Sequence, residues 1–278
     1  MNSDCLNQKM TLITVNGTTL YTERRGDGSP LLLIHGGGED ADMLGRQADG
    51  LAAAGYDVVT YDRRGTRRSG RQDWPGGGAD QHADDAAALI RELGWRLPTV
   101  VGVSSGGVIA LTLAGQHSDS VGSIVAWEPP AVGIIEGGSE ATAAIMAPVD
   151  THLAFHPGDF AGAQAILLST VLGFPVSLDD PAFASARVNA EPFVRDEPAI
   201  TTAALDRARL AGADVTIAVG SAPNGIIAAA VDLLAGWTGR PPVRVEADHE
   251  VYLTEPAVLT GIVTTLDPGQ PPANNGSR

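Results

Sequence analysis

The chain has 278 residues, 44% of them hydrophobic and 18% charged, which is typical of a globular protein and excludes a disordered chain. Its 18 Lys and Arg residues against 33 Asp and Glu residues give a formal net charge of −15, which argues against nucleic acid and anionic membranes as partners. The acidity does not by itself indicate a cationic substrate, because a diffuse negative surface also serves solubility.

The single cysteine, Cys5, excludes an internal disulfide and a cysteine-rich metal site, and we expect it to be an inert thiol. No charged-then-apolar leader opens the sequence, and no uninterrupted apolar run approaches the ~18 residues of a membrane span. We therefore expect a cytoplasmic protein, with no metal and no other cofactor, and the sequence leaves a homo-oligomer open.

Short apolar or β-branched runs alternate with helical patterns along most of the chain. Asn16-Gly17 separates the first two runs and predicts a hairpin. The run 31–34 is continuously apolar, as expected of a strand buried on both faces of a parallel sheet. The predicted strands are 11–15, 19–23, 31–34, 56–61, 99–103, 121–127, 215–219 and 242–246. The predicted helices are 41–54, 80–93, 105 to about 115, 224–237 and 255–266.

The stretch 131–210 breaks this alternation. It is rich in Ala with helical periodicity and has no clear strand pattern, so we predict a helical insertion there. Residues 1–130 and 211–266 then form one α/β core, and the Pro-, Gly-, Asn- and Ser-rich stretch 267–278 is predicted to be a disordered tail. The prolines expected to interrupt the insertion's helices are Pro157, Pro175, Pro181, Pro192 and Pro198.

Alternating strands and helices predict a mostly parallel sheet covered by helices on both faces. Ligands bind such sheets outside the carboxyl ends of the strands. Four polar turns follow those ends: the His-Gly-Gly-Gly turn at 35–38, the turn at 104–106, Glu128, and the loop that carries His249. Their convergence predicts a functional site at this edge.

Gly102, Ser104 and Gly106 form a Gly-x-Ser-x-Gly pattern between a β-rich run and a helix-length apolar segment. A serine at the tip of such a turn is held in a strained conformation that exposes its oxygen. The flanking glycines let strand and helix pass closely, and free N–H groups at the helix start can stabilise a developing negative charge. The pattern predicts a nucleophile, and the alternative is a serine in an ordinary Gly-rich turn.

In order along the chain, the motifs resemble those of the α/β-hydrolase superfamily. They are the 35–38 turn, Asp62-x-Arg64-Gly65-x-x-x-Ser69, the Ser104 pattern, and the late His249 before Glu255-Pro256. The resemblance covers nearly the whole chain. It implies the α/β-hydrolase fold, with 131–210 as its helical cap, and the activity of a serine hydrolase.

The resemblance also implies roles for single residues. Ser104 is the nucleophile, and His249 is the general base, the only one of six histidines that follows the last predicted strand. The backbone N–H groups of Gly37 and Ser105 form the oxyanion hole, and His35 belongs to the oxyanion turn. The alternatives are a surface or core role for His249 and a merely flexible glycine loop at 35–38.

The acidic member of the triad departs from the family's pattern. The family usually carries an aspartate after the penultimate strand, but the loop 220–224 has no carboxylate here. Asp232 lies inside a predicted helix, and Asp248 is adjacent to His249, so neither suits the role. We favour Glu128, because some members of the superfamily carry the acid at that strand end; its alternative is an N-cap or loop role beside Pro129-Pro130.

The stretches 128–130 (Glu-Pro-Pro) and 219–223 (Val-Gly-Ser-Ala-Pro) resemble the zearalenone-type lactonases, which open a macrocyclic ester without a cofactor. This resemblance implies a small apolar ester or lactone as substrate. Hydrolysis of a carbon–carbon bond or a thioester by the same triad stays open. So does a non-catalytic ligand-binding or sensor protein, because the usual aspartate is missing.

Two further groups of side chains call for an interpretation. The arginines Arg63, Arg64, Arg67 and Arg68 are interpreted as structural, with Arg64 paired to Asp62 as an internal brace and no role given to Arg67. One or two aromatic side chains are expected to contact ligand in an apolar pocket under the cap. The candidates are Trp127, Phe155, Phe160, Phe174, Phe183 and Phe193.

Overall fold

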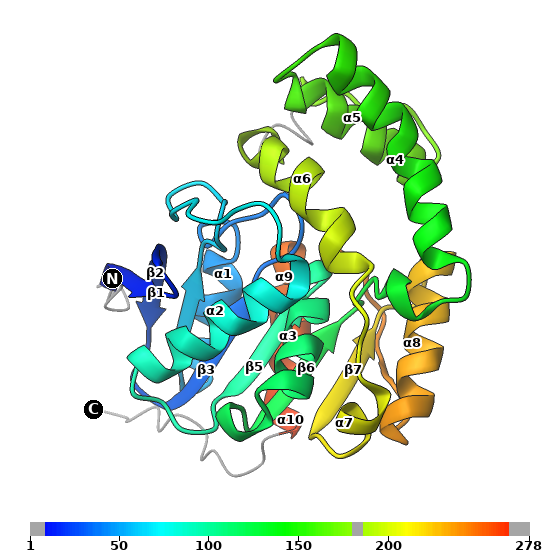
Figure 1. Cartoon of the computed structure of the whole chain (residues 1–278). Helices are drawn as coiled ribbons and strands as arrows, with labels where there is room; N and C mark the ends of the chain where they lie inside the picture. The colour runs from blue at the N-terminus through cyan, green and yellow to red at the C-terminus, as the bar shows by residue number, and fades with distance from the viewer. Residues whose placement is uncertain (1–8, 180–185, 267–278) are drawn as a thin grey trace.

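The structure, a computed structural model, describes residues 9–179 and 186–266 and consists of one sheet between two layers of helices (Figure 1). The strands are β1 (Lys9–Val15), β2 (Thr18–Arg25), β3 (Ser29–Ile34), β4 (Tyr56–Tyr61), β5 (Thr99–Val103), β6 (Ser123–Trp127), β7 (Val215–Val219) and β8 (Val243–Arg244). The helices are α1 (Gly45–Ala53), α2 (Gly78–Glu92), α3 (Ser105–Gln116), α4 (Gly138–Phe155), α5 (Phe160–Leu172), α6 (Ala190–Thr201), α7 (Arg207–Ala211), α8 (Gly225–Thr238), α9 (Val251–Thr254) and α10 (Pro256–Leu266). Short 3₁₀ turns cover Ser118–Ser120, Val132–Ile134 and Ala186–Asn189.

The eight strands of the described chain lie in the order β1-β2-β4-β3-β5-β6-β7-β8. β2 pairs antiparallel with β1 and β4, and all other neighbours pair parallel. The carboxyl ends of β3, β5, β6, β7 and β8 therefore meet at one edge of the sheet. The predicted fold class, a mostly parallel α/β sheet covered on both faces, is confirmed.

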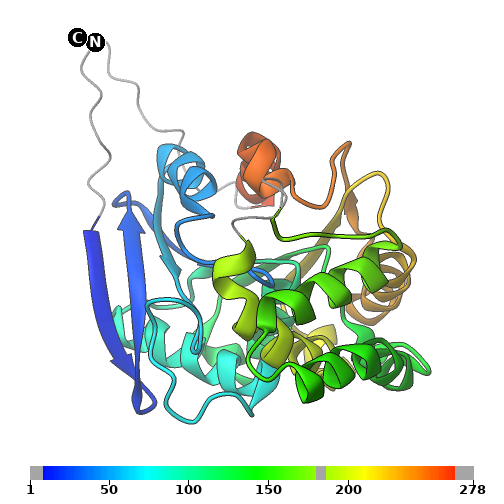
Figure 2. The same ribbon diagram turned by 90° about the horizontal axis from the view of Figure 1, so that it is seen from above.

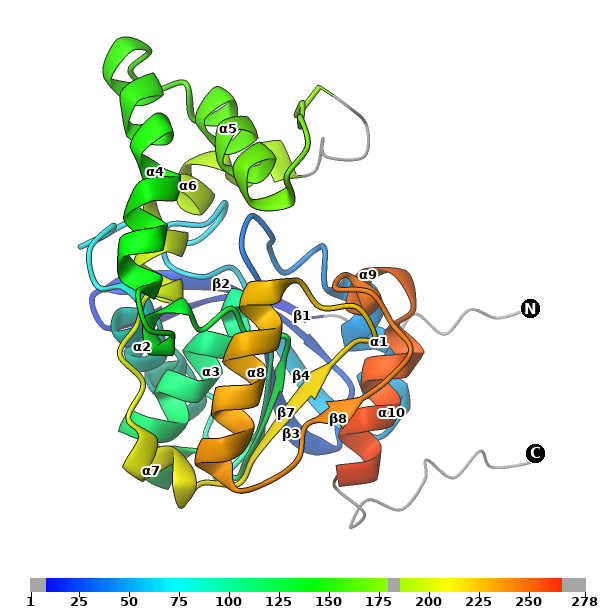
Figure 3. The same ribbon diagram turned by 90° about the vertical axis from the view of Figure 1, so that its right-hand side faces the viewer.

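Strand β3 shows why both faces need helices. Its side chains alternate between the faces, so Leu31 and Leu33 pack in one apolar cluster and Leu32 and Ile34 in the other. α1, α9 and α10 cover the first face, and α2, α3 and α8 cover the second. Figure 3 shows α8 and α10 on opposite sides of the sheet. Burial on both sides explains the unbroken apolar sequence of the strand.

Several predicted boundaries are wrong. The predicted helix 41–54 begins only at Gly45, because the carboxylates of Asp62 and Asp40 accept hydrogen bonds from the backbone N–H groups of Ala41 and Met43 and hold 41–44 in turns. The predicted strand 242–246 shrinks to the two residues of β8.

The helices α4, α5 and α6 follow β6 in the chain and lie beyond the carboxyl edge of the sheet (Figures 1 and 2). They share a small apolar cluster of their own, made of Val149, Ala163, Leu167 and Val194. The prediction that Pro192 and Pro198 interrupt the helices is wrong, because both lie within α6. Pro192 is tolerated because the first turn of a helix leaves its N–H groups unpaired anyway.

No helix in the described part of the chain has both the length and the apolar character needed to cross a membrane. The predicted tail 267–278, Cys5, Pro181 and Phe183 lie outside the described residues.

The packing of β5 against α3 yields a stability prediction. A Cβ atom added to Gly102 would lie 2.2 Å from the carbonyl oxygen of Gly106, whereas one added to Gly115 on α3 would meet no atom within 4 Å. Gly102→Ala should therefore lower the free energy of unfolding by about 1–3 kcal/mol, and Gly115→Ala, the matched control, should raise it by up to ~1 kcal/mol. Urea unfolding measures both. A Gly102→Ala protein as stable as the unmodified chain would contradict the close packing.

Candidate active site

Ser104 lies between β5 and α3 in a backbone conformation that is rare for a residue with a side chain. Its φ is 51° and its ψ is −126°. The backbone N–H of Ser104 donates to the carbonyl of Trp127 at 2.9 Å, and the N–H of Gly107 donates to the carbonyl of Ser104 at 2.8 Å. Ser104 itself is partly exposed. The sheet and the helix thus hold the residue at the turn's tip in a strained conformation.

The 35–38 turn lies directly against the Ser104 turn. A Cβ atom added to Gly36 would lie 3.0 Å from the Cβ of Ser104, and one added to Gly106 would lie 2.3 Å from the carbonyl oxygen of Ile34. The approach of two backbones requires glycine at position 106, and the tight contact with Ser104 favours glycine at position 36. The end of β3 and the start of α3 are thereby brought together.

Gly37 and Ser105 carry the two N–H groups that the resemblance assigns to an oxyanion hole. Among the hydrogen bonds of the described residues, none engages the N–H of Gly37. Ser105 is the first residue of α3, so its N–H has no acceptor within the helix. Gly37 is partly exposed, as Ser104 is. The N–H of Gly37 is thus unengaged within the described chain, on a partly exposed residue, whereas Ser105 itself is buried.

His35 fixes the shape of the 35–38 turn. Its Nε2 accepts from the backbone N–H of Arg63 at 3.1 Å, which leaves Nδ1 to donate to the carbonyl of Gly36 at 2.8 Å. Complete burial, together with the charge of Arg63, holds the pKa of His35 well below its ordinary value. His35 is therefore a neutral, structural histidine.

Glu128 lies at the end of β6 and contacts His249. Its Oε2 lies 2.6 Å from Nδ1 of His249, and its Oε1 accepts from the backbone N–H of Gly220 at 2.9 Å. The glutamate is 2% exposed, and its φ of 42° turns its side chain into the loop after β7. The carboxylate thus reaches the loop where the family usually carries its aspartate. Gly220 has no side chain that would fill this space.

The other acids weighed for this role lie elsewhere. Asp232 pairs with Arg244 at 3.5 Å on the surface, and Asp248 is exposed. Trp127, in contrast, is fully buried and donates from Nε1 to the carbonyl of His249 at 2.9 Å. Trp127 therefore supports the loop of His249 and, being fully buried, is not one of the aromatic side chains that could contact ligand.

Several charges act on the imidazole of His249, which is 33% exposed. Burial acts to lower its pKa, but the hydrogen bond to Glu128 and the negative charges of Glu250, Glu128 and Glu39 raise it, so the pKa of His249 lies above its ordinary value of 6.5. An anionic partner on Nδ1 also fixes the tautomer in which Nε2 carries the lone pair. This is the arrangement that a general base needs.

Glu39 is a member of the site that the sequence analysis missed. Its Oε2 accepts from the backbone N–H of Gly36 at 2.7 Å, and its Oε1 accepts from the hydroxyl of Tyr252 at 2.6 Å. Burial, together with the charge of Glu250, raises the pKa of Glu39 to about 7. Glu39 ties the 35–38 turn to α9, and a carboxylate directly after three glycines was the available sequence signal.

The expected brace between Asp62 and Arg64 is wrong. Arg64 pairs with Asp85 of α2 at 2.7 Å, with both partners buried, while Asp62 pairs with Arg68 at 2.7 Å. Arg64 therefore binds to α2, whereas Asp62 binds to Arg68 within its own loop. Arg67, which had no predicted role, pairs with Asp42 at 2.6 Å.

Arg63, also in this arginine cluster, forms an ion pair that joins the core to α6. Arg63 donates from Nη2 to Glu197 Oε1 at 2.6 Å and from Nη1 to Ser105 Oγ at 3.3 Å. Asp196, the neighbour of Glu197, lies 2.6 Å from Nε2 of His82 on α2. These contacts place α6 beside the 35–38 turn. They could not be predicted from the sequence, because their partners lie far apart along the chain.

Of the other candidate aromatic residues, Phe193 lies against the 35–38 turn: its ring would be 3.0 Å from a Cβ added to Gly37. Phe155 and Phe174 are 79% and 52% exposed.

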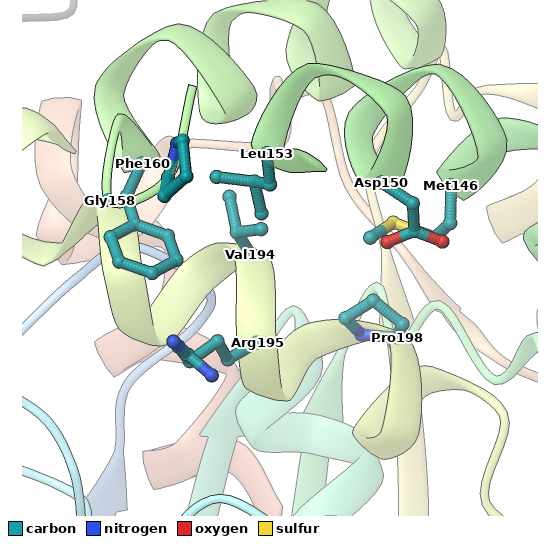
Figure 4. A pocket seen from close by; sticks show the side chains of 9 residues that line it. Met146, Asp150, Leu153, Gly158, Phe160, Val194, Arg195 and Pro198 are labelled. Atoms are coloured by element: carbon teal, nitrogen blue, oxygen red, sulfur yellow. The ribbon is translucent and has the colours of Figure 1, made fainter. Parts of the chain in front are cut away.

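A cavity of about 550 Å³ lies among α4, α5 and α6 (Figure 4). Phe160, Leu153 and Val194 give it apolar walls, and Asp150 and Arg195 add charges. None of the candidate catalytic residues lines it. The cavity therefore lies apart from the Ser104 turn.

No group of three or more His, Cys, Asp or Glu side chains in the part of the chain that the structure describes is arranged to hold a metal ion.

Comparison with known proteins places this geometry in a family. Residues 29–181, more than half of the chain, match the family model described as alpha/beta hydrolase fold. The chain therefore belongs to the alpha/beta hydrolase fold family. An alpha/beta hydrolase of Sphaerobacter thermophilus DSM 20745 superposes with a TM-score of 0.74 at 21% identity, over 92% of this chain and 100% of that one, a likeness of fold.

Two curated relatives match shorter regions. The uncharacterized hydrolase YraK of Bacillus subtilis (strain 168) is 38% identical over 126 residues, which is 45% of this chain and 46% of YraK. The rhodomycin D methylesterase DauP of Streptomyces sp. (strain C5) is 41% identical over 108 residues, 37% of this chain and 36% of DauP. The chain thus spans less than half the length of these relatives.

The charges around His249 yield a prediction about its pKa. Glu128→Gln removes the anion that touches Nδ1, so the pKa of the imidazole should fall. An NMR pH titration of the histidine ring signals, assigned with a His249→Asn variant, measures this. Glu140→Gln changes the net charge equally at an exposed position of α4 and should leave the pKa in place. An equal shift in both variants, or none in Glu128→Gln, would contradict the geometry.

Proposed function

We propose that the protein is a serine hydrolase that cleaves a carboxylic ester, with Ser104 as nucleophile, His249 as general base and Glu128 as the acidic partner. One observation carries the proposal. The buried carboxylate of Glu128 lies 2.6 Å from Nδ1 of the partly exposed His249. It does so at the same edge of the sheet where the strained turn of Ser104 lies against the 35–38 turn, whose Gly37 N–H is unengaged among the described residues. The methylesterase name of one relative agrees with ester chemistry.

The reaction proceeds through an acyl-enzyme. Ser104 Oγ attacks the carbonyl carbon and gives its proton to Nε2 of His249, while the N–H groups of Gly37 and Ser105 stabilise the oxyanion. His249 then protonates the departing alkoxide, which leaves as the alcohol. Water attacks the acyl carbon, again losing its proton to His249, and the carboxylic acid and free Ser104 are formed. The carboxylate of Glu128, in contact with Nδ1, stabilises the imidazolium.

Within the esters, we propose an apolar ester and, in particular, a lactone. The support is the Glu-Pro-Pro and Val-Gly-Ser-Ala-Pro stretches at 128–130 and 219–223, which resemble the zearalenone-type lactonases. The ring of Phe193 beside Gly37 adds apolar surface near the carbonyl site. We further propose that α4, α5 and α6 act as the cap over this site.

The nucleophile is tested by covalent labelling. A fluorophosphonate probe should modify Ser104, identified by peptide mass spectrometry, and Ser104→Ala should abolish the label. In Glu128→Ala the label should form more slowly by roughly 10³–10⁴-fold, because the imidazole loses the partner that orients it. Circular dichroism and thermal unfolding show whether each variant is folded. Folded protein that takes up no label and turns over no ester would instead favour a ligand-binding or sensor protein.

The lactone preference is tested with a matched pair of substrates, an apolar macrolactone and the methyl ester of its ring-opened acid. The kcat/KM for the lactone should be higher by roughly tenfold, because the ring has already lost the rotational freedom that the open chain gives up on binding. Equal values would reduce the proposal to a general esterase. A higher kcat/KM for a thioester, or for a substrate cleaved at a carbon–carbon bond, would instead identify the protein as a thioesterase or a carbon–carbon bond hydrolase.

A further inference from the structure

The carboxylate of Glu197 lies beside the turn that would bind the substrate's carbonyl oxygen. A Cβ atom added to Gly37 would lie 2.7 Å from Cδ of Glu197 and 2.8 Å from its Oε2. Gly37 and Ser104 are both partly exposed, while the Glu197 side chain is 10% exposed. One carboxylate oxygen of α6 therefore lies beside Gly37, on the side where a side chain would project.

The other carboxylate oxygen of Glu197 is held by Arg63. Nη2 of Arg63 donates to Oε1 at 2.6 Å, and the arginine side chain is 1% exposed, so the ion pair is shielded from water. Nη1 of the same guanidinium donates to Ser105 Oγ at 3.3 Å. The contact of Asp196 with His82 holds the same turn of α6 to the core. The carboxylate thus has a fixed position between Gly37 and Arg63.

Oε2 of Glu197 accepts no hydrogen bond from the residues that the structure describes. A carboxylate oxygen in such a site favours a donor, either a hydroxyl or an ammonium group, and repels another anion with little screening by water. The nearest cation, Arg63, is already paired with it. The surroundings of His249 are also acidic: Glu128 contacts the imidazole, and Glu250 and Glu39 act on it electrostatically.

We propose that Glu197 is a specificity-determining residue: its Oε2 accepts a hydrogen bond from a hydroxyl or ammonium group near the scissile carbonyl and disfavours esters that carry a carboxylate there. The inference rests on the proposed ester hydrolysis. It narrows the proposed ester class to otherwise apolar esters that carry one hydrogen-bond donor, a hydroxyl or an ammonium group, near the scissile carbonyl. The local placement of one carboxylate leads to this class, whereas the net charge of the chain does not.

The test uses four matched esters whose acyl chains carry a methyl, hydroxyl, ammonium or carboxylate group at one position, and a second such series with the group on the alcohol. In one of the two series, the unmodified protein should hydrolyse the hydroxyl and ammonium esters with kcat/KM about tenfold or more above that of the methyl ester, and the carboxylate ester least well. Glu197→Gln keeps the shape but removes the charge. It should reduce the ratio of ammonium to carboxylate kcat/KM by about tenfold or more.

The matched control is Glu191→Gln on the same helix. Glu191 pairs with Arg71 and Arg195 near the surface, and its replacement changes the net charge by the same amount. Its ratio of ammonium to carboxylate kcat/KM should equal that of the unmodified protein. An equal shift in both variants would assign the effect to overall charge and overturn the proposal.

The two proposals fail in different ways. If the methyl ester is hydrolysed and Ser104 is labelled, but kcat/KM is equal within both series, the role of Glu197 is wrong while the ester hydrolase stands. If neither ester turnover nor labelling of folded protein occurs, the hydrolase is wrong and the specificity falls with it. The series measured on the unmodified protein decides this even if Glu197→Gln does not fold.

Discussion

The contact between Glu128 and His249 is the interaction on which the geometry of the site depends. It joins the end of β6 to the loop after β8, and the hydrogen bond from Gly220 adds the end of β7. A carboxylate as buried as that of Glu128 is costly unless its oxygens are hydrogen-bonded, and here each oxygen has a partner. Three neighbouring parallel strands must therefore be in register before the histidine is held.

The position of the acid follows from the length of its side chain. Glutamate has one methylene group more than aspartate, and the φ of 42° at Glu128 directs it across the end of β7. Gly220 leaves the room that a side chain in that loop would occupy. A glutamate one strand earlier thus delivers its carboxylate to the loop where the family usually carries an aspartate. The histidine meets an anion in either arrangement.

The sequence predicts those parts of the fold and site that depend on local order. The Ser104 turn and the loop of His249 follow apolar strands of one parallel sheet. Parallel order brings the ends of these strands together, so the sequence could predict that the two residues lie at the same edge. The Arg63–Glu197 and Glu39–Tyr252 contacts span 134 and 213 residues along the chain. Such pairs depend on how packed elements face one another, and no spacing in a single sequence encodes that.

The packing of α4, α5 and α6 could not be predicted from the sequence either. Within the cap proposed for these three helices, α6 and α4 are attached to the rest of the molecule to different degrees. α6 is fixed to the core by a buried ion pair, Arg63–Glu197, and by the buried contact between Asp196 and His82, directly beside the 35–38 turn. α4, in contrast, buries only Gly138 and Val149 completely. A rearrangement of α4 and α5 to fit a larger substrate therefore leaves the proposed oxyanion hole intact. Under the proposed function, differences in substrate size would be accommodated on α4 and α5, whereas charge selection by Glu197 and the carbonyl site would stay together on α6 and the sheet edge.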